Sequence, residues 1–269
     1  MQQLQQAIEQ QNSLMASLYV AEKLQTTMNI GRHIVQLEQF IRGACNAVSG
    51  AQTTEDKLDR FLHYFYTDLA FSSNVSFTSS ANHYFLDKLL DYRTGTPVNL
   101  AIVMCQIGNA IGLKLQQITF SEQCLVRAQI AHSRYCYIDL AEGTKLDWRR
   151  LLECYRNLVN KEAESIPSEL LQPISCEETI VRCLHGIKEA FIQLQQLPDA
   201  LTCSALLLEL SPDDPYERRD RGFLLHQLDC LPLAFKDYDF FIRQCPRDPV
   251  AEMLKTQMQV MPNPELILH

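Results

Sequence analysis

The sequence predicts a mainly α-helical protein of the α+β class, and three observations carry this prediction. Apolar residues recur at the 3.6-residue helical period over most of the chain. Three β-rich runs, separated by short polar breaks, interrupt the helical pattern between residues 114 and 140. Beyond residue 176, the pattern repeats at a fixed spacing. We therefore expect an N-terminal domain with a small antiparallel sheet, followed by a helical array.

The C-terminal repeat has a period of 34 residues, because Leu197-Pro198 recurs as Leu231-Pro232 and Pro212 recurs as Pro246. A helix–turn–helix unit of this length is typical of tetratricopeptide repeats (TPR). Such units stack on one another and present a concave surface that binds other proteins. The expected helices lie near 177–196, 198–210, 216–229 and 232–244, with a capping segment near 249–260.

The N-terminal part begins with helices. Two are expected between residue 3 and about residue 50, and Thr53-Thr54-Glu55-Asp56 resembles the capped, acidic start of a third. The most apolar helix of the chain opens at Pro97, which suits a first helical position, and ends at Gly112. The strands that follow are expected at 114–120, 124–130 and 134–140.

The composition bounds the class of protein. The 269 residues include 24 Lys and Arg against 32 Asp and Glu, so the formal net charge is −8. This balance argues against binding to nucleic acid or to an anionic membrane, since both favour a basic surface. The polar, glutamine-rich start carries no signal-peptide pattern, and no run approaches the roughly 20 apolar residues of a membrane span. We expect a cytoplasmic protein, and its oligomeric state stays open.

The cysteine and histidine patterns predict neither a metal nor another cofactor. The ten cysteines form no C-x-x-C pair, and the seven histidines form no H-E-x-x-H motif. Most of the cysteines have apolar neighbours, so we expect reduced, mostly buried thiols that pack as small hydrophobes.

The segment from Arg93 to Trp148 has an order that can be tested for chemistry: a tight turn, a buried helix, then strands. Thiol acyl-transfer enzymes place a Cys at such a helix start and a His and an Asp on the strands. Three motifs of this segment and one of the repeats are distinctive: Arg93-Thr94-Gly95-Thr96-Pro97-Val98-Asn99-Leu100, Phe120-Ser121-Glu122-Gln123-Cys124-Leu125-Val126-Arg127, Tyr137-Ile138-Asp139 and Glu217-Arg218-Arg219-Asp220-Arg221-Gly222. In these motifs the chain resembles the bacterial transglutaminase-like plus TPR proteins of the YchA/SirB type.

The resemblance implies a degenerate transglutaminase-like domain over residues 1–148, a helical connector over 149–175 and TPR-like repeats with a cap over 176–269. It places Pro97 where the catalytic Cys would stand and Gln123 where the His would stand, while Asp139 keeps the acid position. Acyl transfer needs a thiolate and a proton acceptor within hydrogen-bond reach. We therefore expect a pseudoenzyme with no catalytic residues.

Two rival functions stay open. A cysteine-dependent hydrolase or amidase would use a displaced thiol, either Cys105 or a Cys124–His132–Asp139 site. Because neighbouring strand residues point to opposite faces, Cys124 is expected to face away from the former cleft if Gln123 faces it. Asp139 would otherwise be a structural acceptor that ties a strand to its loop. The second rival is a small-ligand sensor that uses the vestigial cleft.

Arginines are the candidate binding residues. Arg218 and Arg221 lie one turn apart on the first helix of the second repeat, where TPR stacks line their concave groove. They are expected to receive an acidic peptide, or else to form salt bridges to the N-terminal domain. Gly222 is expected to let two helices approach. Arg127 is expected to hold an ion pair or an anion. The function that we expect is a non-enzymatic, regulatory protein-interaction factor.

Overall fold

The computed structural model describes residues 2–25, 27–73, 81–120, 123–159 and 163–261, with the side chain of Gln123 also outside the description. The chain forms two compact units, Met1–Cys183 and Leu184–His269. Their boundary falls inside a helix, α8 (Cys176–Gln193), and so lies later than the expected limit at residue 175. Residues 149–175, expected as a helical connector, belong to the first unit and pack on its sheet through Leu151 and Ile166, and Cys183 of α8 joins the large core of the same unit.

The first unit is mainly helical. Its α-helices are α1 (Gln2–Glu9), α2 (Ser13–Leu24), α3 (Ile30–Ala47), α4 (Thr54–His63), α5 (Leu86–Tyr92), α6 (Pro97–Ala110) and α7 (Trp148–Val159), with single turns of other helix types at η1 (Tyr64–Asp68), η2 (Ala81–Tyr84) and η3 (Ser168–Leu171). Three helices, instead of two, precede residue 50. The break arises at Gln11, which has a φ of 54°, and at Asn12, which caps α2 by accepting from the Met15 N–H.

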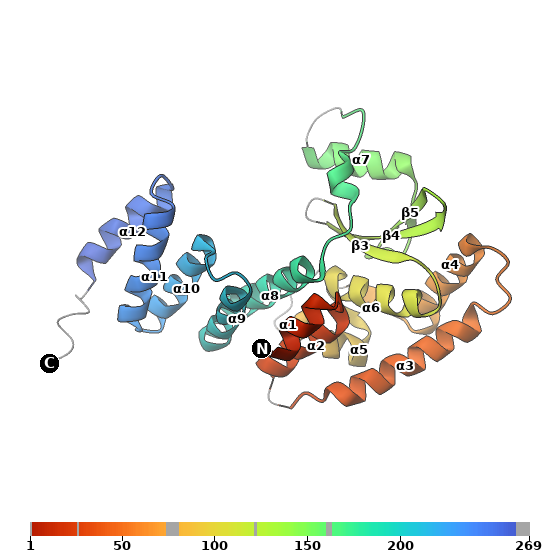
Figure 1. Ribbon diagram of the computed structural model, residues 1–269, viewed down its shortest axis with the longest axis horizontal. Helices are drawn as coiled ribbons and strands as arrows, with labels where there is room; N and C mark the ends of the chain where they lie inside the picture. The colour runs from red at the N-terminus through yellow and green to blue at the C-terminus, as the bar shows by residue number, and fades with distance from the viewer. Residues whose placement is uncertain (1, 26, 74–80, 121–122, 160–162, 262–269) are drawn as a thin grey trace. The chain divides into compact units, whose positions relative to one another are not determined.

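A four-stranded antiparallel sheet follows α6, in the order β3 (Leu115–Phe120), β4 (Gln123–Ala131), β5 (Arg134–Asp139) and β6 (Lys145–Leu146). This confirms the small sheet expected from the sequence. Two short segments, β1 (Ser72–Ser73) and β2 (Thr94–Gly95), pair in parallel before α6. The sheet lies between two helices, with α6 against one face and α7 against the other (Figure 1).

The two faces of the sheet explain the apolar patterns of these helices. Leu115, Val126 and Ile138 project to one face and join the large core that includes Leu100 and Met104 of α6. The alternate residues Ile118, Phe120, Leu125 and Tyr137 project to the other face and pack on Leu151 of α7. Helix α6 is covered on several sides because α2, α3 and α5 also contact it. It is therefore apolar nearly all round, whereas α7 is amphipathic.

The ends of α6 follow the sequence signals. Thr96 caps the helix by accepting from the Asn99 N–H at 3.3 Å, and Pro97 occupies the first turn. Gly112 follows the helix with a φ of 83°, a left-handed conformation that favours glycine. Asn109 then connects the helix to the sheet, since its side chain binds both the N–H and the carbonyl oxygen of Leu115.

The second unit contains the remaining part of α8, then α9 (Leu197–Leu210), α10 (Pro215–Gln227), α11 (Leu231–Gln244) and α12 (Pro249–Val260). The repeat is visible in the caps: Asp214 and Asp248 begin α10 and α12, and each is followed by a proline. Buried Leu225, Ala234 and Tyr238 form the core with residues of α12. The predicted helical repeats and the C-terminal capping helix are confirmed.

Gly222 of α10 lies directly against α11. A Cβ atom at this position would lie 2.7 Å from the ring of Tyr238, which is fully buried. The expectation that a small residue lets the two helices approach is confirmed.

We predict that Gly222→Ala destabilises the second unit by about 1–3 kcal/mol, because the buried Tyr238 ring must move from its packed position. Chemical denaturation followed by circular dichroism measures the free energy of unfolding. The control is Gly31→Ala at the start of α3, where the nearest atom to the new Cβ is 3.4 Å away. Equal stability of the two variants would contradict the tight α10–α11 contact.

Candidate functional site

The three vestigial catalytic positions do not form a triad in the described part of the structure. Pro97 lies in the first turn of α6 and offers no nucleophilic atom. Gln123 begins β4, opposite Phe120, and its side chain lies outside the described residues. Asp139 ends β5 and accepts hydrogen bonds from the N–H groups of Ala141 at 2.8 Å and Glu142 at 3.3 Å. Asp139 is thus a structural acceptor in the turn that follows its strand.

The strand register separates Asp139 from the start of α6. Asp139 is directly opposite Leu125, and residues in such a pair project to the same face. Leu125 belongs to the core on the α7 side of the sheet. Pro97 begins the helix that covers the other side. By this register, the side chain of Asp139 projects from the face of the sheet opposite to the one that α6 covers.

Cys124 lies on the α6 face of the sheet. The register decides this, because Cys124 alternates with Leu125 on the strand and joins the core that contains α6. The expectation that it faces away from the former cleft if Gln123 faces that cleft stays a prediction, because the side chain of Gln123 lies outside the described residues. Burial raises the pKa of the Cys124 thiol to about 12. Burial also raises the pKa of Cys105 far above its usual range, and the neighbouring Cys124 adds to that rise. Both thiols are protonated at neutral pH and are poor nucleophiles.

The alternative Cys124–His132–Asp139 site is wrong in its geometry. Cys124 lies near the start of β4, and the exposed His132 lies beyond its end, in the turn before β5. Eight extended residues at ~3.3 Å each separate the two by roughly 26 Å. No proton can pass directly between these side chains.

Arg127 binds neutral groups instead of the expected acid or anion. Its Nε and Nη2 donate to Oε1 of Gln116 at 3.0 and 2.8 Å, and its Nη1 donates to the carbonyl oxygen of Leu171 at 2.8 Å. The guanidinium also lies 4.7 Å from the ring centre of Tyr135. Within the described residues, Arg127 therefore acts as a structural connection between β3, β4 and η3.

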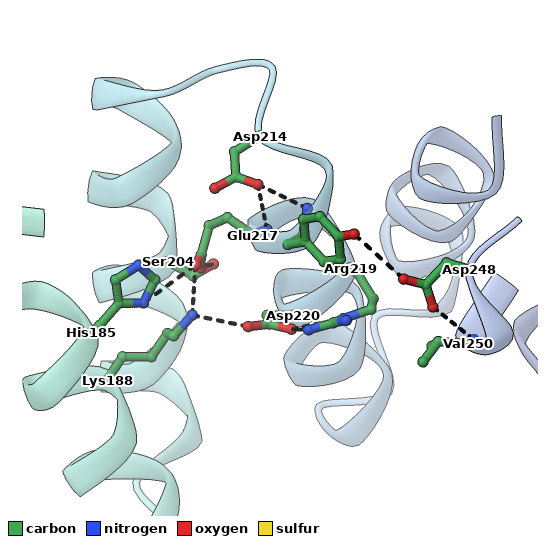
Figure 2. A network of polar contacts seen from close by, with 10 residues as sticks. His185, Lys188, Ser204, Asp214, Glu217, Arg219, Asp220, Asp248 and Val250 are labelled. Atoms are coloured by element: carbon green, nitrogen blue, oxygen red, sulfur yellow. Dashed lines mark hydrogen bonds and ion pairs between the residues drawn. The ribbon is translucent and has the colours of Figure 1, made fainter. Parts of the chain in front are cut away.

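The second unit contains a buried polar network that joins α8, α9 and α10 (Figure 2). Lys188, 5% exposed, places its Nζ 2.6 Å from Oε2 of Glu217 and 3.3 Å from Oδ2 of Asp220. The hydroxyl of fully buried Ser204 donates to the other oxygen of Glu217. Buried charges are tolerated when they are paired and hydrogen-bonded, as Lys188 and Glu217 are here.

His185 lies at the border of the same network, with Nδ1 3.9 Å from Oε2 of Glu217. Its pKa is lowered, first by burial and then by the nearby charge of Lys188. The imidazole is therefore neutral at pH 7, and Lys188 supplies the positive charge that balances Glu217.

The two arginines expected in an open groove are engaged inside the repeat unit. Arg221 forms a two-pronged contact with Asp237 of α11, with both N–O distances at 2.7 Å. Arg218 lies 3.6 Å from the same carboxylate and donates to the carbonyl oxygen of Pro212. Asp237 is 2% exposed. An acidic peptide that contacts Arg218 and Arg221 would have to share them with this buried carboxylate.

Sequence reasoning missed Lys188, Ser204 and Asp237, which are polar partners of the Glu217–Gly222 segment. One signal was available for two of them. Each lies on the apolar stripe of its helix, since Leu184 and Phe191 are one turn from Lys188, and Ala234 and Phe241 are one turn from Asp237. A charge at a core position of a repeat helix indicates a buried partner on the neighbouring helix.

The second unit also has an apolar groove between the end of α8, the start of α9 and α10. Its volume is about 440 Å³, and it is lined by Ile192, Leu197, Phe223 and Leu224, with Gln195, Asp220 and Gln227 among them. Ile192 and Phe223 are 38% and 39% exposed. Two large apolar side chains thus stand in a hollow where a partner's side chain could replace water.

The described residues contain no group of three His, Cys, Asp or Glu side chains placed to hold a metal ion. Among the same residues, no helix is both long enough and apolar enough to cross a membrane.

We predict that Lys188→Met lowers the free energy of unfolding of the second unit by about 3 kcal/mol, because Glu217 stays buried without its counter-charge. The control is Lys255→Met, which removes an exposed pair with Glu252 and should cost less than about 0.5 kcal/mol. Urea titrations compare the two. A double variant, Lys188→Met with Glu217→Leu, should recover part of the loss. A cost for Lys188→Met no larger than the control would show that the pair is not isolated from solvent.

We predict that iodoacetamide modifies the exposed Cys45 and Cys230 of the native protein first, at neutral pH. Cys105 and Cys124 should react at least about a hundredfold more slowly, since the thiolate fraction falls tenfold with each unit by which the pKa rises. Peptide mass spectrometry over a time course measures the four rates. Unfolding in urea is the control, and it should equalise them. A fast thiol at position 105 or 124 in the native state would favour the hydrolase.

Comparison with known proteins identifies both units. Residues 32–185 match the model of the transglutaminase-like superfamily, and residues 187–259 match a tetratricopeptide repeat model. Protein SirB1 of Salmonella typhimurium is 29% identical over 87% of both chains, as is the UPF0162 protein YchA of Escherichia coli K12. A UPF0162 protein of Vibrio cholerae is 31% identical over 84% of both chains. No solved structure matches. The expected resemblance is confirmed: the chain belongs to the transglutaminase-like superfamily, among proteins of the SirB1/YchA type that carry TPR repeats.

Proposed function

We propose that this protein is a non-enzymatic protein-interaction and regulatory factor, in which the transglutaminase-like unit is a pseudoenzyme and the repeat unit docks a partner. The carrying observation is the α8–α10 groove, where Ile192 and Phe223 are exposed in a hollow of about 440 Å³. TPR units in general bind other proteins, and this groove lies inside the matched repeat region.

The proposal of a pseudoenzyme is supported by the positions that acyl transfer would need. Pro97 cannot supply a nucleophile, and Asp139 is engaged by the N–H groups of its own turn. The displaced thiols that a hydrolase would use, at Cys105 and Cys124, have raised pKa values. All ten cysteines are free, which suits a reducing compartment, and we propose the cytoplasm as the place of action.

The chemistry of the groove favours an apolar segment of the partner protein. Its one charged lining residue, Asp220, already contacts Lys188 and Arg219. Arg218 and Arg221 are bound to Asp237, so they offer an acidic partner only a shared charge. We therefore propose that apolar side chains of the partner enter between Ile192 and Phe223. Acidic residues of the partner, if present, would add contacts at the edge.

We predict that Phe223→Glu and Ile192→Glu each weaken partner binding at least about tenfold, because a carboxylate would be desolvated in the bound groove. The matched control is Leu233→Glu on α11, which replaces a 52% exposed apolar residue outside the groove. A photo-crosslinking amino acid at position 223, compared with one at position 233, identifies the partner in cells. Binding of the purified partner to each variant is then measured by calorimetry.

The salt dependence of that binding separates the two kinds of partner. An apolar contact should change little between low and high salt, whereas a contact driven by acidic residues should weaken as screening rises. If the partner crosslinks equally from positions 223 and 233, or binds all three glutamate variants alike, the groove is not the docking surface.

A further inference from the structure

The first unit contains a second hollow, separate from the vestigial catalytic positions. It is a cavity of about 190 Å³ between α6, β3 and the start of α8. Its polar lining includes Cys105, Gln106 and Asn109 of α6, Gln116 and Gln117 of β3, and Thr179 of α8. Pro97, Gln123 and Asp139 are not part of this lining. The expected ligand cleft at those three positions is therefore not where this cavity lies.

The wall of this cavity is polar but carries no charge. None of its lining residues is Asp, Glu, Lys, Arg or His, and burial keeps Cys105 and Cys176 in the neutral thiol form by raising their pKa values. A charged ligand would lose its hydration here without meeting a counter-charge. The cavity is also smaller than the ≈300 Å³ at which pockets for drug-sized molecules begin. The wall therefore selects small, uncharged molecules.

Several polar groups that line the cavity already form hydrogen bonds within the protein. The carboxamide of Asn109 forms hydrogen bonds with the carbonyl oxygen and the N–H of Leu115, and the hydroxyl of Thr179 donates to the carbonyl oxygen of Ser175. Gln116 accepts from Arg127 through its Oε1, and its side chain projects from the face of β3 opposite to that of Leu115 and Gln117, so it does not serve a ligand on the α6 side. Gln106 of α6 and Gln117 of β3 remain, and the buried donor of Gln117 favours a ligand that brings an acceptor oxygen.

Among these groups, Gln117 is the one with a buried amide donor that lacks a partner in the described part of the structure. It is 9% exposed, and its Nε2 has no hydrogen-bond partner among the described residues. The thiol of Cys124 is the neighbour of this amide, and its contact with Gln117 offsets a part of the rise that burial causes in the pKa of Cys124. Sulfur is a weak acceptor, so this contact does not replace a hydrogen bond to oxygen. Buried amide donors in native proteins are nearly always satisfied, by protein, by water or by a ligand. The exposed Asn109 and Gln116 mark the mouth of the cavity, and the buried Gln117 lies deeper.

We propose that this cavity binds a small uncharged molecule that bears an amide or hydroxyl oxygen, with Gln117 donating to that oxygen. The cavity would then be a ligand site on the transglutaminase-like unit, built beside α6 and not at its former catalytic end. The proposal does not depend on docking at the repeat unit, since every lining residue belongs to Met1–Cys183.

The test is nuclear magnetic resonance of the full, isotope-labelled chain with four probes of similar size. Propionamide and glycerol are neutral and carry acceptor oxygens, whereas propionate and ethylammonium are charged. We expect saturable shifts of the Gln117 and Thr179 signals with the neutral pair only. Shifts that grow linearly with all four probes would mean that the cavity holds water alone, and they would overturn the proposal.

Variants assign the site. Gln117→Leu removes the donor at similar size and should weaken propionamide binding about tenfold, the loss expected for one hydrogen bond. The control is Gln129→Leu on β4, a half-buried glutamine outside this cavity, which should leave the affinity unchanged. If Gln117→Leu does not fold, Gln106→Leu on the half-buried wall of α6 takes its place. Unchanged binding in the variant that folds would contradict the assignment.

Discussion

The burial of α6 is the constraint on which the first unit depends. This helix has apolar residues on nearly every side, and Leu100, Val103, Met104 and Ile107 are fully excluded from water. At about 1.5–3 kcal/mol for each such side chain, no arrangement that leaves a face of α6 exposed can compete. The sheet covers one side, and α2, α3 and α5 cover others. The same exclusion of water that stabilises the fold raises the pKa of Cys105 and Cys124 and so suppresses thiol chemistry.

The second unit is constrained by its size, because it has fewer repeats than a free-standing stack usually needs in order to bury a shared core. Its helices are joined by charges as well as by apolar packing. Lys188 reaches Glu217 from α8 to α10, and Arg221 reaches Asp237 from α10 to α11. Such buried pairs are costly to desolvate, so their contribution is to fix which helices meet and in what register. Arg218 and Arg221 are both paired with Asp237 in this way, and the groove lined by Ile192 and Phe223 is mainly apolar.

Much of the fold could be predicted from local signals in the sequence. Thr96-Pro97 and Gly112 mark the two ends of α6, and Asp214 and Asp248 mark the starts of repeat helices, because capping and backbone preferences act over a few residues. The division of the chain was predicted less well. Residues 149–175 were expected as a helical connector, and the structure adds that Leu151 and Ile166 pack on the α7 side of the sheet. That packing joins residues distant in sequence, and no local pattern reports it.

The sequence by itself determined most of the helices, the three main strands and the repeat, since these follow from residue type and spacing. Only the tertiary structure decided which face of the sheet Cys124 occupies. The alternation of side chains along a strand tells which residues share a face, but the pairing with neighbouring strands decides which of the two faces that is. The tertiary structure also decided that Arg218 and Arg221 bind Asp237, and that Gln117 lies buried beside a cavity without an acceptor among the described residues. Partners of buried polar groups are set by long-range packing, which brings together residues that the sequence keeps apart.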